Sequence, residues 1–341
     1  MANAAITTLT ARTPAPLEES AVALDYDDVT LVPRVTSTLA HRADARPAVV
    51  LGPLQLQVPM LGSPMPDVCG VDMCLALAEH GALGVLHRFQ SIDAQVAELR
   101  EVLQHGGPVA AAVGSTGDYR ERFDRLREAG CRVVCIDTAN GAHVQVADAI
   151  AWMRVRDAEI FVIAGNVASA EGFRWLEEAG ADAIRVGIAG GSVCETRNET
   201  GVFAPTPYAV AEAAAVRQTA LIIGDSGVRH PADLCKLLAL GADCVMVGSV
   251  LAGTREAPGR VIVIDGKKYK IMRGAASFSV QQEYGDGDPE YVEGSETMVA
   301  YKGSVAGVMR RYLAGLRSSM SYMNARTLEE FRQNVSVLRL R

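Results

Sequence analysis

The chain has 341 residues, of which 49% are hydrophobic and 21% are charged. This is enough apolar material to bury a large core, either as one big α/β domain with insertions or as two domains. Its 33 basic and 40 acidic residues give a formal charge of −7 with no basic cluster, which argues against a nucleic-acid partner.

Residues 1–21 are rich in Ala, Thr and Pro and lack the regions of a secretory signal, so we expect a loose tail. No stretch reaches the roughly eighteen apolar residues that a bilayer span needs. The seven cysteines are an odd number and lie mostly in apolar runs, which disfavours a disulfide framework. These features predict a cytoplasmic protein with no membrane partner.

Short apolar segments alternate along the chain with helical patterns. Several of the helical patterns end just before a glycine, which suits the left-handed position after a helix. These patterns are 71–79, 121–129, 170–179 and 232–240, with Gly81, Gly130, Gly180 and Gly241 after them. The strand-like segments centre near Leu61, Val85, Ala111, Val134, Val162, Ile184, Ile222 and Val245.

Strand and helix in regular succession predict a (β/α)8 TIM barrel, an α/β fold. We expect residues 22–338 to form this single domain, with a hairpin and flap inserted at about 260–302. A helix from 304 to about 315 is expected to close the barrel. A doubly wound open sheet is the alternative, which is weakened because no Gly-x-Gly-x-x-Gly follows the first strand.

The segment 187–205, called the cysteine loop below, follows the sixth expected strand and shows no clear secondary-structure pattern. Loops of this length are uncommon in compact domains unless they are functional. Adjacent glycines at 190 and 191 allow the backbone to approach a ligand, and Cys194 lies beside Thr196. This composition favours a nucleophile loop over the alternative, a connector with an incidental buried cysteine.

Small residues gather at the same expected rim of the barrel. Ser192 lies in the cysteine loop, Gly227 follows the seventh strand, and Gly248 and Ser249 follow the eighth. Backbone N–H groups in such loops bind phosphate. Each glycine alone is explained by a tight turn, but their combination favours a nucleotide monophosphate as ligand.

Six segments carry a family resemblance. They are Asp-Tyr-Asp-Asp-Val-Thr-Leu-Val-Pro at 25–33, Ser-Pro-Met at 63–65, Ile-Asp-Thr-Ala-Asn-Gly at 136–141, Ala-Gly-Asn-Val at 164–167, the cysteine loop at 187–197 and Asp-Gly-Lys-Lys-Tyr-Lys at 265–270. In combination they resemble the IMP dehydrogenase/GMP reductase family over residues 22 to 338.

Within that family the sequence looks more like a reductase. Dehydrogenases typically carry CBS modules after the second βα unit, and here the chain passes from His87 to Val109 without room for them. Dehydrogenases also use an Arg-Tyr pair in the flap to activate water, and residues 279–300 contain no arginine. The resemblance implies NADPH as cofactor, with NADH open, and a homo-oligomer, as most relatives are tetramers.

The resemblance also implies roles for individual residues. Cys194 matches the nucleophile that attacks C2 of a guanine ring, and Thr196 matches the threonine that moves a proton around the leaving ammonia. The residues that match substrate contacts are Ser63, Met65, Ser192, Asp225, Gly227, Gly248, Ser249, Arg273 and Gly274. Those that match cofactor contacts are Arg88, Ser115, Thr116, Asp137 and Asn140. Backbone carbonyls of Gly187, Gly190 and Cys194 would hold a monovalent cation such as K⁺.

Several positions depart from the family pattern. Phe278 stands where reductases carry a glutamate at the guanine edge, Met272 replaces an aromatic residue, and Pro66 replaces an aspartate. Glu195 replaces a threonine, and is the candidate for a compensating acid. Four functions remain open: GMP reduction with Glu195 as acid, reduction of a modified guanine such as a 7-deazaguanine nucleotide, nucleotide binding without turnover, and IMP dehydrogenase-type oxidation of IMP to XMP.

Overall fold

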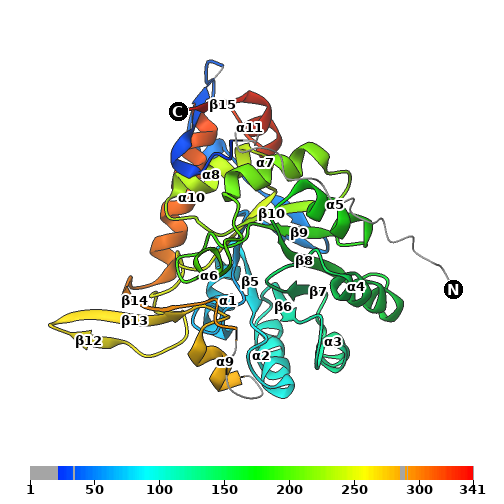
Figure 1. The fold of residues 1–341 in the computed structure, drawn as a ribbon. Helices are drawn as coiled ribbons and strands as arrows, with labels where there is room; N and C mark the ends of the chain where they lie inside the picture. The colour runs from blue at the N-terminus through cyan, green and yellow to red at the C-terminus, as the bar shows by residue number, and fades with distance from the viewer. Residues whose placement is uncertain (1–21, 34, 285–288, 290, 341) are drawn as a thin grey trace.

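The structure is a computed structural model that describes residues 22–33, 35–284, 289 and 291–340 (Figure 1). The predicted tail at 1–21 and part of the predicted flap lie outside the described residues. The eight central strands are β4 (Met60–Gly62), β5 (Leu83–Leu86), β6 (Val109–Val113), β7 (Val133–Asp137), β8 (Phe161–Val167), β9 (Ala183–Val186), β10 (Leu221–Asp225) and β11 (Cys244–Val247). They are parallel and close into a barrel in the order β10-β11-β4-β5-β6-β7-β8-β9. The (β/α)8 prediction is confirmed, and closure of the sheet excludes the open alternative.

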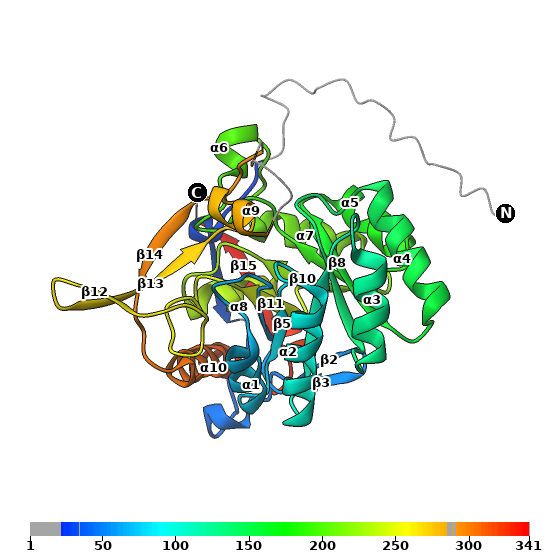
Figure 2. The ribbon, with the colours of Figure 1, turned by 90° about the horizontal axis from the view of Figure 1, so that it is seen from below.

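Helices surround the barrel (Figure 2). They are α1 (Val71–Glu79), α2 (Ile92–Gln104), α3 (Tyr119–Glu128), α4 (Val144–Arg156), α5 (Ala170–Glu178), α7 (Thr206–Val216) and α8 (Pro231–Ala239), with α10 (Val305–Tyr322) and α11 (Leu328–Asn334) near the C-terminus. All four glycines predicted to follow helices have positive φ, from 71° at Gly81 to 117° at Gly241. No described helix has both the length and the apolarity that a membrane crossing needs.

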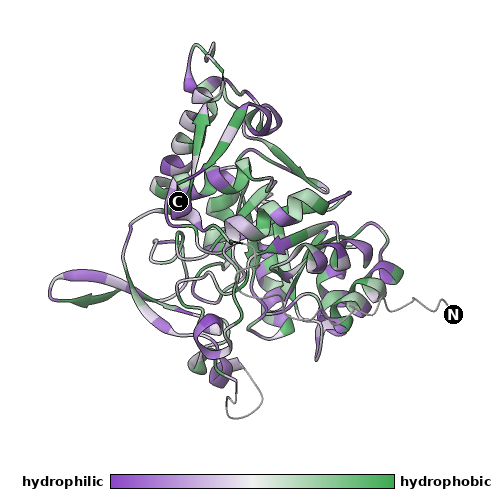
Figure 3. Cartoon of the chain, turned by 45° about the horizontal axis from the view of Figure 1, so that its top comes forward, coloured by the Kyte–Doolittle hydropathy of each residue, from purple (hydrophilic) through white to green (hydrophobic). Residues whose placement is uncertain are grey.

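The strands bury both of their faces, because successive side chains point alternately into the barrel and toward the helices. In β6, Ala110 and Ala112 belong to the inner cluster, whereas Val109, Ala111 and Val113 belong to the cluster under the helices. The barrel strands are accordingly mostly apolar, and polar residues lie mainly on the outer helices (Figure 3).

A short hairpin, β2 (Val49–Leu51) and β3 (Leu54–Leu56), covers the end of the barrel where the strands begin. Its Leu51 and Leu56 are buried in the inner cluster, against which Phe161 and Leu221, the first residues of β8 and β10, also pack. With this end filled by apolar side chains, the opposite end, where the strands finish, is the one that can hold a ligand.

The first and last strands of the described chain pair, β1 (Val29–Pro33) lying antiparallel to β15 (Val335–Arg339). The predicted hairpin and flap region forms a second sheet from β12 (Ile262–Ile264), β13 (Lys267–Arg273) and β14 (Glu296–Ala300), which projects from one side of the barrel (Figure 1). Helix α9 (Phe278–Tyr284) lies between β13 and β14 in the sequence.

The helix predicted from 304 to about 315 is longer than expected and runs on to Tyr322. Gly315 does not end it. A Cβ at this glycine would lie 2.5 Å from the Cβ of Pro231, so the glycine permits close packing of α10 against α8.

The packing of β5 against α1 leads to a stability prediction. A Cβ added at Gly84 would lie 2.5 Å from Cys74 Sγ and 2.7 Å from its Cα. Gly84→Ala should therefore lower the free energy of unfolding by about 1–3 kcal/mol through overpacking. The matched control is Gly307→Ala in α10, where an added Cβ meets nothing within 4 Å, and which should be neutral or stabilising by up to about 1 kcal/mol. Denaturant unfolding measures both, and equal effects would contradict the packing argument.

Candidate functional site

A cavity of about 820 Å³ opens at the end of the barrel where the strands finish. Its wall combines loops that follow the barrel strands with residues from the segment between β13 and β14. Fourteen of the nineteen residues predicted for the site lie in this wall: Ser63, Met65, Arg88, Asp137, Gly187, Gly190, Ser192, Cys194, Thr196, Asp225, Gly227, Gly248, Ser249 and Gly274. The remaining five do not: Ser115, Thr116, Asn140, Glu195 and Arg273.

The cysteine loop starts with two glycines whose lack of a side chain is required. A Cβ at Gly187, which has φ of 142°, would lie 1.9 Å from the carbonyl oxygen of Asp225. A Cβ at Gly190 would lie 2.6 Å from Ser226 Oγ. The loop therefore packs directly on the end of β10, and this contact helps to determine where Cys194 lies.

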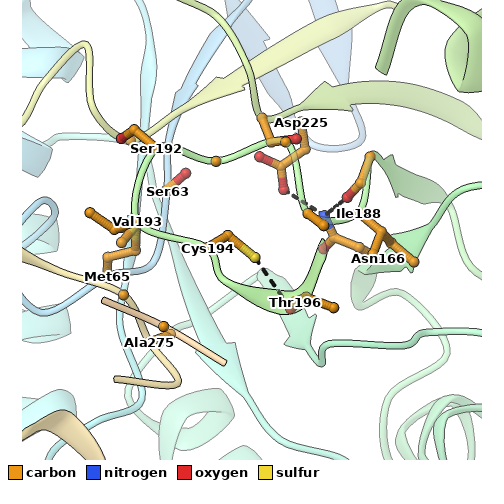
Figure 4. A pocket seen from close by; sticks show the side chains of 18 of the residues that line it. Ser63, Met65, Asn166, Ile188, Ser192, Val193, Cys194, Thr196, Asp225 and Ala275 are labelled. Atoms are coloured by element: carbon orange, nitrogen blue, oxygen red, sulfur yellow. Dashed lines mark hydrogen bonds between the residues drawn. The ribbon is translucent and has the colours of Figure 1, made fainter. Parts of the chain in front are cut away.

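Cys194 follows these glycines and points into the cavity, with its thiol donating to Thr196 Oγ1 at 3.3 Å (Figure 4). It is partly exposed, whereas the other six cysteines are buried. Burial raises the pKa of Cys131 and Cys135 to about 12, which keeps these thiols protonated and unreactive. Among the seven cysteines, Cys194 is thus the one available to a ligand.

The expectation that the cysteine loop lacks secondary structure is wrong for its middle part. Residues Thr196–Thr200 form a short helix, α6, which Gly201 ends with φ of 73°. Arg197 in this helix lies over the Phe203 ring, 4.3 Å from its centroid. The helix holds Thr196 in a fixed position next to the thiol.

The second half of the flap, residues 291–295, pairs with the cysteine loop. Glu195 N donates to Glu293 O at 2.8 Å, Ser295 N donates to Val193 O at 2.9 Å, and Cys194 and Gly294 form an antiparallel bridge. This pairing brings Glu293 into the cavity wall. The sequence alone does not single out Glu293, because acidic residues are frequent in this segment and only the register of the pairing shows which of them lines the cavity.

Glu195 does not fit its predicted role as a compensating acid. Its carboxylate accepts from Asn198 Nδ2 at 2.6 Å on the outer side of α6, and the residue lies outside the cavity wall. The hydrogen bond from Asn198 lowers the pKa of Glu195, so this carboxyl group stays ionised and is a poor proton donor. Phe278, at the start of α9, also lies outside the cavity wall and is 50% exposed.

A buried arginine that the sequence analysis did not single out organises the floor of the cavity. Arg185 Nη1 contacts Asp137 Oδ1 at 2.5 Å, and its Nε contacts Asp225 Oδ2 at 2.9 Å. Asn166 Nδ2 donates to the same Asp225 oxygen at 2.8 Å and to Gly187 O at 2.7 Å. The neighbouring carboxylates raise the pKa of Arg185 against the effect of its burial. The sequence signal that could have identified Arg185 is a charged residue inside an otherwise apolar strand, because charged residues are rarely buried without a partner.

The four residues predicted to bind phosphate, Ser192, Gly227, Gly248 and Ser249, all line the cavity. Gly227 has φ of 77° and faces the ring of Tyr26, whose hydroxyl donates to Ser226 O at 2.8 Å. Gly248 lies close to Ser63 and Met65, because an added Cβ would be 3.5 Å from Ser63 Oγ and 3.3 Å from Met65 Sδ. Asp225 is anchored through Oδ2, which leaves Oδ1 for a ligand (Figure 4).

Only two of the five predicted cofactor residues reach the cavity. Arg88 packs over the Phe89 ring at 4.8 Å, and its Nε is buried without a hydrogen bond, 3.9 Å from Asp137 Oδ2. Thr116 and Asn140 are exposed, and Asn140 Oδ1 accepts from Ala142 N at 3.2 Å within its own turn. Ser115, Thr116 and Asn140 lie outside the cavity wall, and a role for them in cofactor binding stays a prediction. Arg273 is paired with carboxylates elsewhere, as described below.

Comparison with known proteins is consistent with this geometry. Residues 23–341 match the family model described as IMP dehydrogenase / GMP reductase domain. A GMP reductase of Lactobacillus delbrueckii subsp. bulgaricus is 35% identical over 316 residues, which cover 91% of this chain and 93% of that one. An inosine-5′-monophosphate dehydrogenase of Aquifex aeolicus is 42% identical over 242 residues, 68% of this chain but 49% of that protein, so the chain spans about half of that relative's length.

Among solved structures, a GMP reductase variant from Trypanosoma brucei in complex with guanosine 5′-monophosphate superposes with a TM-score of 0.88 and 27% identity. The match covers 95% of this chain and 96% of that one. Together, these similarities show that the chain belongs to the IMP dehydrogenase/GMP reductase family of oxidoreductases.

Proposed function

We propose that this protein catalyses the NADPH-dependent reductive deamination of a guanine nucleotide to the corresponding inosine nucleotide. The main support for this proposal is that Cys194, Thr196 and Glu293 line the same nucleotide-sized cavity. The Cys194 thiol and the Thr196 hydroxyl are 3.3 Å apart there. Relatives named GMP reductase that align along 91% of this chain support the same activity.

In this reaction Cys194 attacks C2 of the guanine ring and forms a carbon–sulfur bond, while the bond from C2 to the amino nitrogen breaks. The thiol proton passes to Thr196 Oγ1, its hydrogen-bond acceptor. Glu293 donates a proton to the amine, which leaves as ammonia, and Thr196 passes a proton on to Glu293 in its place, so that one proton moves in total. The ring remains on the enzyme as a thioimidate. When hydride adds to C2, the carbon–sulfur bond breaks and the Cys194 thiolate is restored.

A nicotinamide cofactor, when bound, supplies that hydride. The residues present fit such a group, because Arg88 offers a buried Nε without a partner and lies with Asp137 and Thr138 in the wall. We propose that these residues hold it, with NADPH preferred and NADH as the alternative. A K⁺ ion on the carbonyls of the cysteine loop stays a prediction, and Gly187 O already accepts from Asn166.

On the substrate side, we propose that the backbone of Gly227, Gly248 and Ser249 and the Ser192 hydroxyl bind the phosphate. Asp225, held by Arg185, accepts from the ribose hydroxyls. The base lies against Met65 and the segment Gly274–Ala276, which is built from small residues. Such a wall leaves room for a guanine or a ring-modified guanine, so a 7-deazaguanine monophosphate is a second candidate substrate.

A second candidate function is oxidation of IMP to XMP, which the 42% identity to a dehydrogenase favours. Hydrolysis of the covalent intermediate requires an activated water, and residues 279–300 contain no arginine to activate it. Nucleotide binding without turnover is the remaining alternative, which the intact pairing of Cys194 and Thr196 disfavours.

The first functional prediction concerns the nucleophile. Cys194→Ala should lower kcat by about 10⁴-fold or more, because no other thiol reaches the ring. The dissociation constant for the nucleotide should change little, since the phosphate and ribose contacts come from other residues. Anaerobic NADPH oxidation and calorimetric binding measure the two quantities, and substantial turnover in this variant would end the covalent mechanism.

The second functional prediction separates the two glutamates. Glu293→Gln should lower kcat by about 10²-fold or more, because a glutamine cannot donate the proton to the leaving amine. Glu195→Gln is the matched control one residue after the nucleophile, and should leave kcat within about twofold because its carboxylate faces solvent. The opposite ranking would restore Glu195 as the acid.

The third functional prediction concerns the direction of the reaction. With IMP and NAD⁺ the enzyme should release no XMP, because the flap has no arginine to activate water. Chromatography of the products under conditions that give full turnover of a guanine nucleotide with NADPH makes the comparison. Sustained XMP formation would instead show that the protein acts as an IMP dehydrogenase.

A further inference from the structure

Two parts of the chain that are distant in sequence meet beside the cavity. Asp67 follows β4, next to the substituted Pro66, and Arg273 is the last residue of β13. Arg273 Nε contacts Asp67 Oδ2 at 2.8 Å, its Nη2 contacts Oδ1 at 2.9 Å, and its backbone N–H donates to Oδ2 at 3.0 Å. The aspartate carboxylate thus receives both the side chain and the main chain of one residue.

The same guanidinium makes a third contact in another direction. Arg273 Nη1 lies 2.6 Å from Glu283 Oε2, which belongs to α9. The side chains of Arg273 and Asp67 are 18% and 10% exposed, whereas that of Glu283 is 48% exposed. Arg273 therefore links a nearly buried carboxylate on the barrel to a more exposed one on α9.

Each end of this link is attached to the cavity wall. On the barrel side, Met65 lies two residues before Asp67, and its carbonyl accepts from Val68 N at 3.0 Å and Cys69 N at 3.1 Å. On the other side, Arg273 is followed directly by Gly274 in the wall. The ion pair thus holds together the two parts of the cavity wall, at Met65 and at Gly274, between which we propose that the base binds.

Helix α9 also contacts the segment 291–295, which contains Glu293. Gln281 Nε2 donates to Ala276 O and to Tyr291 O, each at 2.9 Å. Glu293 N also donates to Ala276 O, at 3.2 Å. A continuous set of contacts therefore runs from Asp67 through Arg273 and α9 to the residues that pair with the cysteine loop.

We propose that Arg273 is a positioning residue, which holds α9 and residues 291–295 against the barrel so that Glu293 stays next to Cys194. It lies outside the cavity wall and touches no reacting atom, so it replaces the substrate-binding role predicted for it. The inference deepens the proposed function and rests on it for the role of Glu293. An arginine is required because a planar guanidinium can contact two carboxylates at once, whereas a lysine offers a single point charge.

The test uses Glu283→Ala, because this partly exposed carboxylate can be removed without leaving a buried charge unpaired. Hydrogen exchange is measured at the amides of Glu195 and Ser295, whose hydrogen bonds join the flap to the cysteine loop, and at the amide of Glu293, which donates to Ala276 O. We expect exchange at these amides to rise by about three- to tenfold, with kcat falling by a similar factor and the nucleotide dissociation constant unchanged. Arg273→Lys should show the same loosening.

The matched control is Asp93→Ala, which removes an exposed ion pair of the same 2.6 Å length between Asp93 in α2 and Arg125 in α3. It should change neither exchange at the three amides nor kcat. If Glu283→Ala and Arg273→Lys both fold and leave exchange at the three amides unchanged, or if exchange rises equally at the amides of the barrel strands, the proposal is overturned. Because exchange needs no turnover, this result is separate from a failure of the wild type to reduce any guanine nucleotide, which would count against the proposed function alone.

Discussion

The candidate active site depends on the pairing of two segments, the cysteine loop and residues 291–295. Hydrogen bonds between Glu195 and Glu293 and between Ser295 and Val193 join them, and neither segment belongs to the barrel itself. Without this pairing Cys194 and Thr196 would remain together, since they are close in sequence, but Glu293 would not face them. The chemistry proposed here therefore rests on main-chain hydrogen bonds between two loops.

The barrel supports these loops from below through Arg185. This residue is 7% exposed and lies between Asp137 and Asp225, with Asn166 joining Asp225 to the start of the cysteine loop. A buried ion pair stabilises little by itself, but removing its cation leaves uncompensated carboxylates, at a cost of about 3–5 kcal/mol. Arg185 thus holds Asp225, Asp137 and the start of the cysteine loop in one arrangement.

Local patterns were sufficient to predict the fold. Each predicted strand centre lies in an observed strand, and helix α1 has the predicted bounds. Hydrophobic periods of two and 3.6 residues, and helix-ending glycines such as Gly241, act over only a few residues of the chain. The cysteine loop, Gly227 and Gly248 likewise follow strands, as their local sequence predicted. Helix α10 extends past Gly315 because tertiary contact with Pro231 outweighs the local tendency of glycine to end a helix.

Site residues that depend on long-range register could not be predicted in this way. Glu293 faces the cavity only because β13 and β14 bring residues 291–295 onto the cysteine loop. Arg273 contacts Asp67, from which it is separated by 206 positions in the sequence. Glu195 is a residue for which local sequence gave the wrong prediction. Its position next to Cys194 suggested a catalytic acid, but in the structure the Glu195 carboxylate accepts a hydrogen bond from Asn198 in α6.

The covalent role of Cys194 is tested most directly by mass spectrometry of the enzyme incubated with a guanine nucleotide and no reductant. The account predicts that the peptide containing Cys194 gains the mass of the nucleotide less ammonia, with one ammonia released per modified site, and that adding NADPH removes the adduct. Turnover with NADPH but no adduct on this peptide, or an adduct on another cysteine, would contradict it.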